Sequence, residues 1–154
     1  MPQPPANGGG SVAGVAPHHP NSIAQQAPAC EVPRVGTVAL VDDHDVIALG
    51  VTTMLAMTAS LHFRGGYPSV AQLLEETAAT KDRLPDVVLL DLRLPDGSDP
   101  SHNARTLRTR GAAVIAYTSG DDPYLIRRAC EGGVLGVVRK SETPDVLIST
   151  IWAA

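Results

Sequence analysis

From residue 35 to residue 154, short apolar runs alternate with segments whose apolar residues recur at helical spacing. The runs are rich in β-branched residues and nearly continuous, which is typical of parallel strands covered on both faces. They predict strands at 35–41, 61–65, 86–90, 112–117 and 134–139. A helix is predicted after each run, so the pattern indicates five β/α units in a parallel sheet with right-handed crossovers.

Local signals mark the ends of the predicted helices. Ser69 followed by Gln72 reads as a capping box that opens the second helix. Three pairs place a capping side chain before a proline at the first helical position, namely Asp99-Pro100, Asp122-Pro123 and Thr143-Pro144. Glycines at 111 and at 132–133 predict where the third and fourth helices end.

The composition changes near residue 34. Residues 1–34 hold seven of the 13 prolines and no aromatic residue, and their only charged side chains are Glu31 and Arg34. Such a stretch buries too little apolar surface to offset the entropy of ordering it. We therefore expect a flexible extension over 1–34, with a solvated His18-His19 pair, and one folded domain over 35–154.

Charge, hydropathy and cysteine content argue against several classes of protein. A net charge of −4 and a pI of about 5.6 give no support for a nucleic-acid-binding surface. No apolar run approaches the roughly 18 residues of a membrane span, and the N-terminus does not read as a secretory signal. Two cysteines make neither a disulfide framework nor a metal site. We expect a cytoplasmic protein with reduced thiols, and Cys130 packed on the apolar side of the fourth helix.

Polar residues follow four of the five predicted strands. They are Asp42-Asp43, Asp91, Thr118-Ser119 and Lys140. In an open α/β sheet, ligands bind beyond the carboxyl ends of the strands, so these groups are expected to converge. Three converging carboxylates repel one another, and a divalent cation such as Mg²⁺ removes that conflict. With an ammonium and a hydroxyl added, the set suits a phosphoryl group beside a carboxylate nucleophile.

Each of these residues also has a purely structural interpretation. Asp42 or Asp43 could cap the first helix, and Asp91 could be a turn residue before Pro95. Thr118 could bond the local backbone, and Lys140 could be a solvated surface lysine. The joint occurrence of all of them at strand ends favours a functional site.

Four segments, 38–44, 87–97, 114–119 and 136–141, resemble the receiver domain of two-component response regulators, in the right order and spacing. The start Asp42-Asp43-His44 and the later Gly50-Val51 look most like the LuxR/FixJ/NarL subfamily. The resemblance implies a flavodoxin-like (βα)5 fold, an α/β doubly wound parallel sheet of order 2-1-3-4-5.

The resemblance also implies residue roles. Asp91 would be the nucleophile that becomes an aspartyl phosphate, with Thr118 and Lys140 contacting the phosphoryl oxygens and the small Ser119 leaving room for the group. Mg²⁺ would be bound directly by Asp43, Asp91 and the backbone carbonyl of Arg93, and through a water by Asp42.

By the same resemblance, the protein is a phosphoacceptor switch that assists its own phosphorylation and dephosphorylation, and is not otherwise an enzyme. The expected partner is a sensor histidine kinase, with a homodimer through residues 121–152. No membrane is expected to be involved. DNA would be contacted only through an output domain, which we expect to be absent from residues 35–154. A role in the control of transcription therefore rests on analogy with the family alone.

Two positions depart from the family pattern. Val137 stands where receivers commonly have an aromatic switch residue, and Tyr117 does not replace it. This favours the alternative of a receiver-like interaction module regulated without phosphorylation. Arg93 occupies a position that tunes phosphate lifetime in the family. A phosphatase of the haloacid-dehalogenase type needs a second aspartate there, so Arg93 argues against that third interpretation.

Overall fold

The structure is a computed structural model that describes residues 1–5, 7–10, 14 and 36–154. The chain divides into two units, residues 1–31 and 32–154. The extension predicted over 1–34 falls largely outside the described residues, as do Cys30 and the His18-His19 pair. The folded domain over the second unit is described below.

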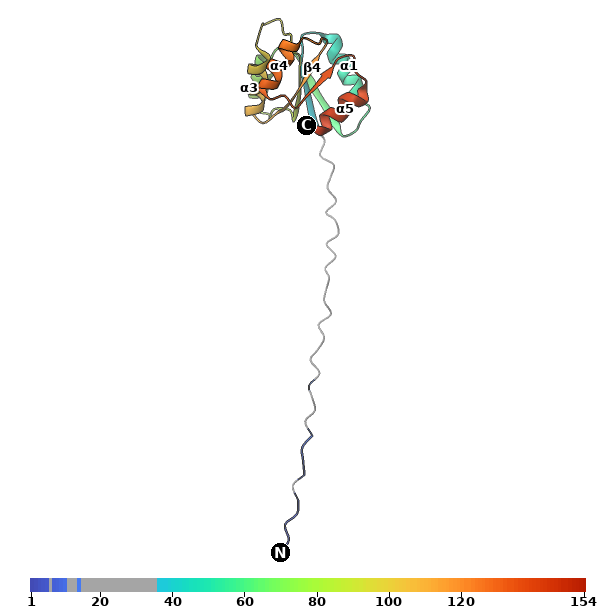
Figure 1. The fold of residues 1–154 in the computed structure, drawn as a ribbon, viewed down its shortest axis with the longest axis vertical. Helices are drawn as coiled ribbons and strands as arrows, with labels where there is room; N and C mark the ends of the chain where they lie inside the picture. Colours follow the sequence, from blue (N-terminus) through green and yellow to red (C-terminus); the bar gives the residue numbers. More distant parts are fainter. Residues whose placement is uncertain (6, 11–13, 15–35) are drawn as a thin grey trace. The chain divides into compact units, whose positions relative to one another are not determined.

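Five strands alternate with five helices in the folded unit (Figure 1). The elements are β1 Gly36–Val41, α1 Asp45–Leu55, β2 Leu61–Tyr67, α2 Val70–Thr80, β3 Val87–Leu90, α3 Pro100–Thr109, β4 Ala113–Thr118, α4 Pro123–Gly132, β5 Gly136–Arg139 and α5 Pro144–Ala153. All strand pairs are parallel and the order is β2-β1-β3-β4-β5. The flavodoxin-like doubly wound fold expected from the sequence is confirmed.

Side chains of the strands point alternately to the two faces of the sheet, where they form three core clusters. On one face, Val38 and Leu40 of β1 pack with α1 and α5, which lie together on one side of the sheet in Figure 1. On the other face, Ala39 and Val41 pack with α2 and α3, and Ala116 packs with α4. Because both faces are covered, β3 is fully buried and β1 and β4 are buried over most of their length, which explains their continuous apolar runs.

The two edge strands are irregular or short. Pairing between β1 and β2 shifts register between Val38 and Ala39, and Gly65 in β2 adopts a φ of 144°, which favours glycine. The strand predicted to stop at 65 therefore continues to Tyr67. At the other edge, β5 has only four residues.

Most of the predicted helix ends are confirmed. Side chains of Ser69, Asp99 and Asp122 accept hydrogen bonds from the first turns of their helices, and Gly133 ends α4 in the left-handed conformation. Thr143 occupies the N-cap of α5 but makes no capping bond, so that part of the prediction is wrong. Asp145 supplies a negative charge in that first turn instead.

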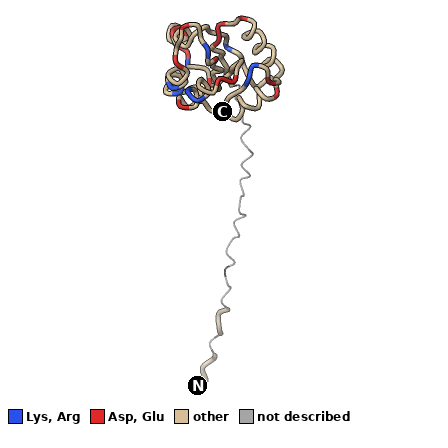
Figure 2. The backbone as a smooth tube through the Cα atoms, turned by 45° about the horizontal axis from the view of Figure 1, so that its top comes forward, with Lys and Arg blue, Asp and Glu red and all other residues tan. Residues whose placement is uncertain are grey.

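The prediction that Cys130 packs on the apolar side of α4 is wrong, because this residue is exposed. The buried residues of the helix are Ala129 and Gly132, and Cys130 follows Ala129 by one position, about 100° around the helix. Within the described part of the chain, no helix has the length and apolarity needed to cross a bilayer. Acidic and basic positions are interspersed over the folded unit (Figure 2).

Candidate functional site

The backbone ladders continue one residue past the strand ends and place two aspartates side by side. The amide of Asp91 donates to the carbonyl of Val41 at 2.9 Å, and the amide of Asp42 donates to the carbonyl of Tyr67 at 2.8 Å. Since β1 and β3 are neighbours, both carboxylates lie at the same edge of the sheet. Both residues are buried, with exposed fractions of 5% for Asp42 and 4% for Asp91.

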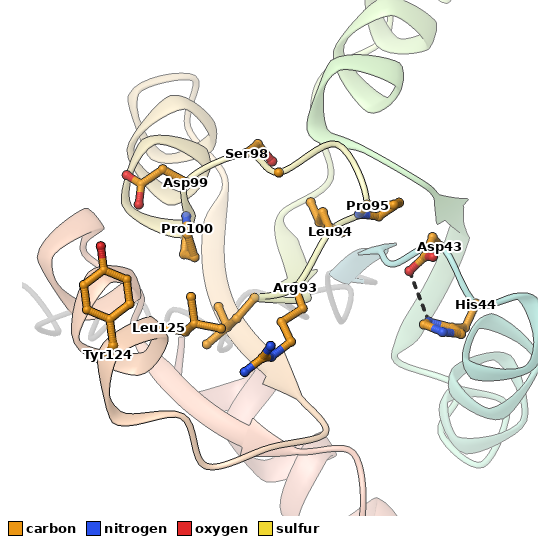
Figure 3. A pocket seen from close by; sticks show the side chains of 12 residues that line it. Asp43, His44, Arg93, Leu94, Pro95, Ser98, Asp99, Pro100, Tyr124 and Leu125 are labelled. Carbon is orange, nitrogen blue, oxygen red and sulfur yellow. Dashed lines mark ion pairs between the residues drawn. The ribbon is translucent and has the colours of Figure 1, made fainter.

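An acidic cluster forms at this edge. Asp42, Asp43, Asp91 and His44 each offer one ligand atom, and these atoms all lie within 4.8 Å of one another. Asp43 is the more accessible carboxylate, with 31% of its side chain exposed. It lines an open depression of about 580 Å³ between the β3–α3 loop and the start of α4 (Figure 3). The cluster is thus buried on one side and open to an incoming group on the other.

Lys140 joins two of the carboxylates. Its amide donates to the carbonyl of Thr118 at 2.9 Å, which fixes its place after β5. Its ammonium lies 2.5 Å from Asp42 Oδ2 and 3.0 Å from Asp91 Oδ2, with 9% of the side chain exposed. Burial alone would lower the pKa of Lys140, but the two carboxylates outweigh it and raise the pKa. A solvated surface lysine is therefore the wrong interpretation.

The side chain of Asp42 is the most enclosed of the cluster, with 0% exposed against 5% for that of Asp91. Burial would raise the pKa of its carboxyl, but Lys140 and the two hydrogen bonds from His44 lower it below the ordinary value. Its Oδ1 accepts both the amide and the imidazole Nδ1 of His44, each at 2.9 Å. Its Oδ2 is buried without a hydrogen bond of acceptable geometry, although the Lys140 ammonium is close. This oxygen retains capacity for a further electropositive partner.

His44 is the N-cap residue of α1 and makes no side-chain cap bond. Its exposed imidazole lies 2.9 Å from Asp42 Oδ1 and 3.1 Å from Asp43 Oδ1. These carboxylates raise the pKa of His44, the bond to Asp42 most of all. Asp42 bonds the amide of His44, outside the helix, so the helix-cap interpretation of Asp42 is wrong.

The other predicted site residues, Arg93, Thr118 and Ser119, lie at or just after the ends of β3 and β4. Asp91 Oδ1 accepts the amide of Arg93 at 3.2 Å, which orients the carboxylate. Thr118 is buried at the end of β4, and its hydroxyl exchanges long contacts with Gly120, at 3.3 Å from the amide and 3.4 Å from the carbonyl. Ser119 is exposed beside it in the chain.

Sequence reasoning missed four ion-paired contacts around this edge: those of His44 with Asp42 and with Asp43, of Arg93 with Asp122, and of Arg139 with Asp121. Part of the first had a local signal. Asp42, Asp91 and Asp96 each accept the amide two residues ahead, a turn typical of aspartate. The arginine pairs join residues 29 and 18 positions apart, and no local pattern predicts them.

The donor set suits a hard divalent cation. Three carboxylates lie within reach of one another, and the side chain of Asp42 is fully buried. Oxygen ligands with this charge are those that Mg²⁺ and similar ions prefer. Lys140 forms ion pairs with Asp42 and Asp91, whereas the more exposed Asp43 lies against the imidazole of His44.

Residues 38–152 match the family model of the response regulator receiver domain. The chain belongs to the response regulator receiver family. It is 30% identical over 116 residues to the probable transcriptional regulatory protein SgaR of Hyphomicrobium methylovorum, covering 74% of this chain and 53% of SgaR. It is 29% identical over 121 residues to the probable transcriptional regulatory protein NarL of Mycobacterium tuberculosis, covering 77% of this chain and 54% of NarL.

The solved receiver domain of the putative response regulator NarL from Mycobacterium tuberculosis has the same fold. Its TM-score is 0.67 at 28% identity, over 79% of this chain and 96% of that one. The resemblance to LuxR/NarL-type receivers is therefore confirmed. This receiver chain spans about half the length of the curated relatives that it matches.

The resemblance places Val137 where receivers commonly have an aromatic switch residue. The Val137 side chain is 41% exposed on β5. Tyr117 is buried in the core on the side of α1 and α5.

Proposed function

We propose that this receiver domain is a phosphoacceptor switch, in which a histidine kinase transfers a phosphoryl group to Asp91. The observation that supports this most is the setting of the Asp91 carboxylate. One oxygen accepts the Arg93 amide and the other accepts the Lys140 ammonium, within reach of two further carboxylates. A turn residue with no chemical role would not need a buried lysine from a strand two positions away in the sheet.

In the proposed reaction, a carboxylate oxygen of Asp91 attacks the phosphorus of a phosphohistidine. The P–N bond breaks, the ring nitrogen keeps its electron pair, and an acyl phosphate forms on Asp91. Lys140, 3.0 Å from Asp91 Oδ2, holds the carboxylate in place and offsets charge on the transferred group. Thr118 would turn its hydroxyl from Gly120 to a phosphoryl oxygen.

The acidic cluster would hold Mg²⁺ in this proposal. Asp43, Asp91 and the backbone carbonyl of Arg93 would bind it directly, and Asp42 through a water. When bound, the ion neutralises charge on the phosphoryl group and on the carboxylates. His44, which lies against Asp42 and Asp43, would have to leave Asp43 for direct binding there.

The wider role is also part of the proposal. Curated relatives are transcriptional regulatory proteins, and this chain matches about half of their length. We infer that phosphorylation controls transcription in the cytoplasm through a separate DNA-binding segment, with a homodimer through residues 121–152.

One observation favours a second function, a receiver-like interaction module regulated without phosphorylation. Val137 leaves the domain without the aromatic residue that usually couples phosphorylation to the surface. The intact set of Asp42, Asp43, Asp91 and Lys140 argues for the phosphoacceptor instead.

The test is the intact mass of the protein after incubation with acetyl phosphate and Mg²⁺. The parent and an Asp96→Asn control, which changes an exposed aspartate of the same loop, should each gain one phosphoryl group. Asp91→Asn should gain none, and EDTA should block the gain in the parent. No gain in a folded parent that binds Mg²⁺ would remove the phosphoacceptor proposal and leave the interaction module.

A further inference from the structure

An ion pair links the loop of the phosphoacceptor to the start of α4. Arg93 Nη2 lies 2.8 Å from Asp122 Oδ2, although the two residues are 29 positions apart. The backbone amide of Arg93 donates to Asp91, so the same residue contacts both the nucleophile and the next loop. Figure 3 shows the Arg93 side chain extending between the loop of Asp43 and His44 and helix α4.

Asp122 uses its two oxygens for two tasks. Its Oδ1 caps α4 by accepting the amides of Tyr124 at 3.0 Å and Leu125 at 3.4 Å. Its Oδ2 accepts the guanidinium of Arg93. A change at Oδ2 therefore acts on the carboxylate that fixes the first turn of the helix.

The ion pair is of a kind that exchanges partners readily. The Arg93 side chain is 68% exposed and that of Asp122 is 35% exposed, so water competes with their contact. A phosphoryl group carries about −1.5 to −2 charges, compared with −1 on a carboxylate, and arginine binds it with stronger hydrogen bonds. A phosphoryl group on Asp91 would appear two residues from Arg93, in competition with Asp122.

We propose that Arg93 and Asp122 form a latch: on phosphorylation of Asp91, the guanidinium leaves Asp122 for the phosphoryl group, and Asp122 transmits this loss to the first turn of α4. The inference rests on the proposed function at Asp91. It assigns to Arg93 a positioning role in the output of the switch, and to Asp122 the role of transmitting residue.

A second contact acts on the same loop. The Thr118 hydroxyl holds Gly120, and it loses both contacts if it turns to the phosphoryl group. Residues 118–122 would then lose contacts at both ends: those of Thr118 with Gly120, and that of Asp122 with Arg93. This route needs no aromatic side chain on β5, so it accounts for a working switch with Val137 exposed at that position.

The chain offers well-matched variants. Asp122→Asn removes the ion pair but keeps a good N-cap residue, so it separates the latch from the cap. Asp121→Asn removes an identical charge from the neighbouring residue and breaks only the Arg139–Asp121 pair at 2.7 Å. Arg93→Gln removes the latch from the other side, and Arg93→Lys tests whether a cation alone restores it.

The measurement is the position of the amide NMR signals of Tyr124 and Leu125 in the intact chain, before and after acetyl phosphate with Mg²⁺. In the parent and in Asp121→Asn, phosphorylation should displace both signals. In Asp122→Asn and Arg93→Gln, the signals should start displaced toward the phosphorylated position, and phosphorylation should move them less than half as far. Arg93→Lys should recover part of the parental displacement.

Intact mass of the same samples separates the two hypotheses. A gain of one phosphoryl group in all of these variants, with equal displacements in the parent, Asp122→Asn and Arg93→Gln, would overturn the latch and leave the phosphoacceptor intact. No gain in the parent would overturn the phosphoacceptor and, with it, a latch driven by phosphate. Exchange of the α4 first-turn amides should be about two- to fivefold faster in unphosphorylated Arg93→Gln than in the parent, the scale of one exposed ion pair.

Discussion

Gly132 of α4 lies against Ser101 of α3, so closely that a methyl group on Gly132 would come within 2.6 Å of the Ser101 carbonyl oxygen. It would also lie 2.8 Å from Cβ of Ala104. A flexible side chain could move away from such a methyl group, but the backbone of α3 cannot. This glycine therefore sets how near the two helices approach.

Gly132→Ala should destabilise the domain by about 1–3 kcal/mol, the usual cost of overpacking. Gly50→Ala is the matched control, because the space around Gly50 in α1 is open and alanine favours helices. It should stabilise by about 0.5–1 kcal/mol. Urea unfolding of both variants checks this, and equal effects would show that the α3–α4 contact is not tight.

Lys140→Met should make the stability of the domain depend on Mg²⁺. Without the ammonium, the buried carboxylates of Asp42 and Asp91 repel each other, at a cost of about 3–5 kcal/mol. Mg²⁺ should restore much of this loss and EDTA should abolish the recovery. Arg139→Met, which changes the exposed neighbour, should have a small effect that Mg²⁺ leaves unchanged. Urea unfolding with and without the ion gives the comparison.

Asp43→Asn should weaken Mg²⁺ binding by about 10- to 100-fold, since it removes the most accessible carboxylate of the cluster. Asp45→Asn, an exposed aspartate two residues away in the first turn of α1, should bind the ion like the parent. Calorimetric titration with Mg²⁺ measures both. Equal weakening in the two variants would point to a general charge effect in place of direct coordination.

The contribution of the Asp99–Arg128 pair should disappear in acid. Two hydrogen bonds from Arg128, at 3.0 Å and 2.7 Å, hold the pKa of Asp99 below its ordinary value of 3.8. A carboxyl with a lower pKa in the folded state stabilises above the ordinary value, and this stability is lost as the pH falls through the lowered pKa. Arg128→Gln should therefore lower the melting temperature near neutral pH. Its difference from the parent should shrink below about pH 4, and a difference that is constant with pH would contradict the assignment.

The fold was predictable because the central strands are largely buried between two layers of helices and four of the five helices carry a local signal at one end. Predicted strands began one or two residues early, as at Ala112 and Val134, because these residues pack against the cores from outside the strands. The extent of β2 was not predictable, since Gly65 and Gly66 resemble a turn and are in fact part of an irregular edge strand.

At the site, strand ends predicted that Asp42, Asp91 and Lys140 meet, because parallel strands bring their carboxyl ends to one edge. The partner of each exposed arginine was beyond prediction. Arg93 and Arg139 have long side chains, and their choice of Asp122 and Asp121 depends on the path of the β4–α4 loop in three dimensions. Cys130 was predicted to be buried, but α4 buries only Ala129 and Gly132, and the next residue after Ala129 already faces solvent.

The irregular β2 and the short β5 have a consequence for self-association. An exposed strand edge invites another chain to extend the sheet, and a bulge or a very short strand discourages this. Here a register shift and Gly65 interrupt the edge strand β2, and the other edge strand, β5, has only four residues. Copies of this domain are therefore expected to associate through helices and not through a continuous intermolecular sheet. A change in α4 would then alter the contact between copies directly.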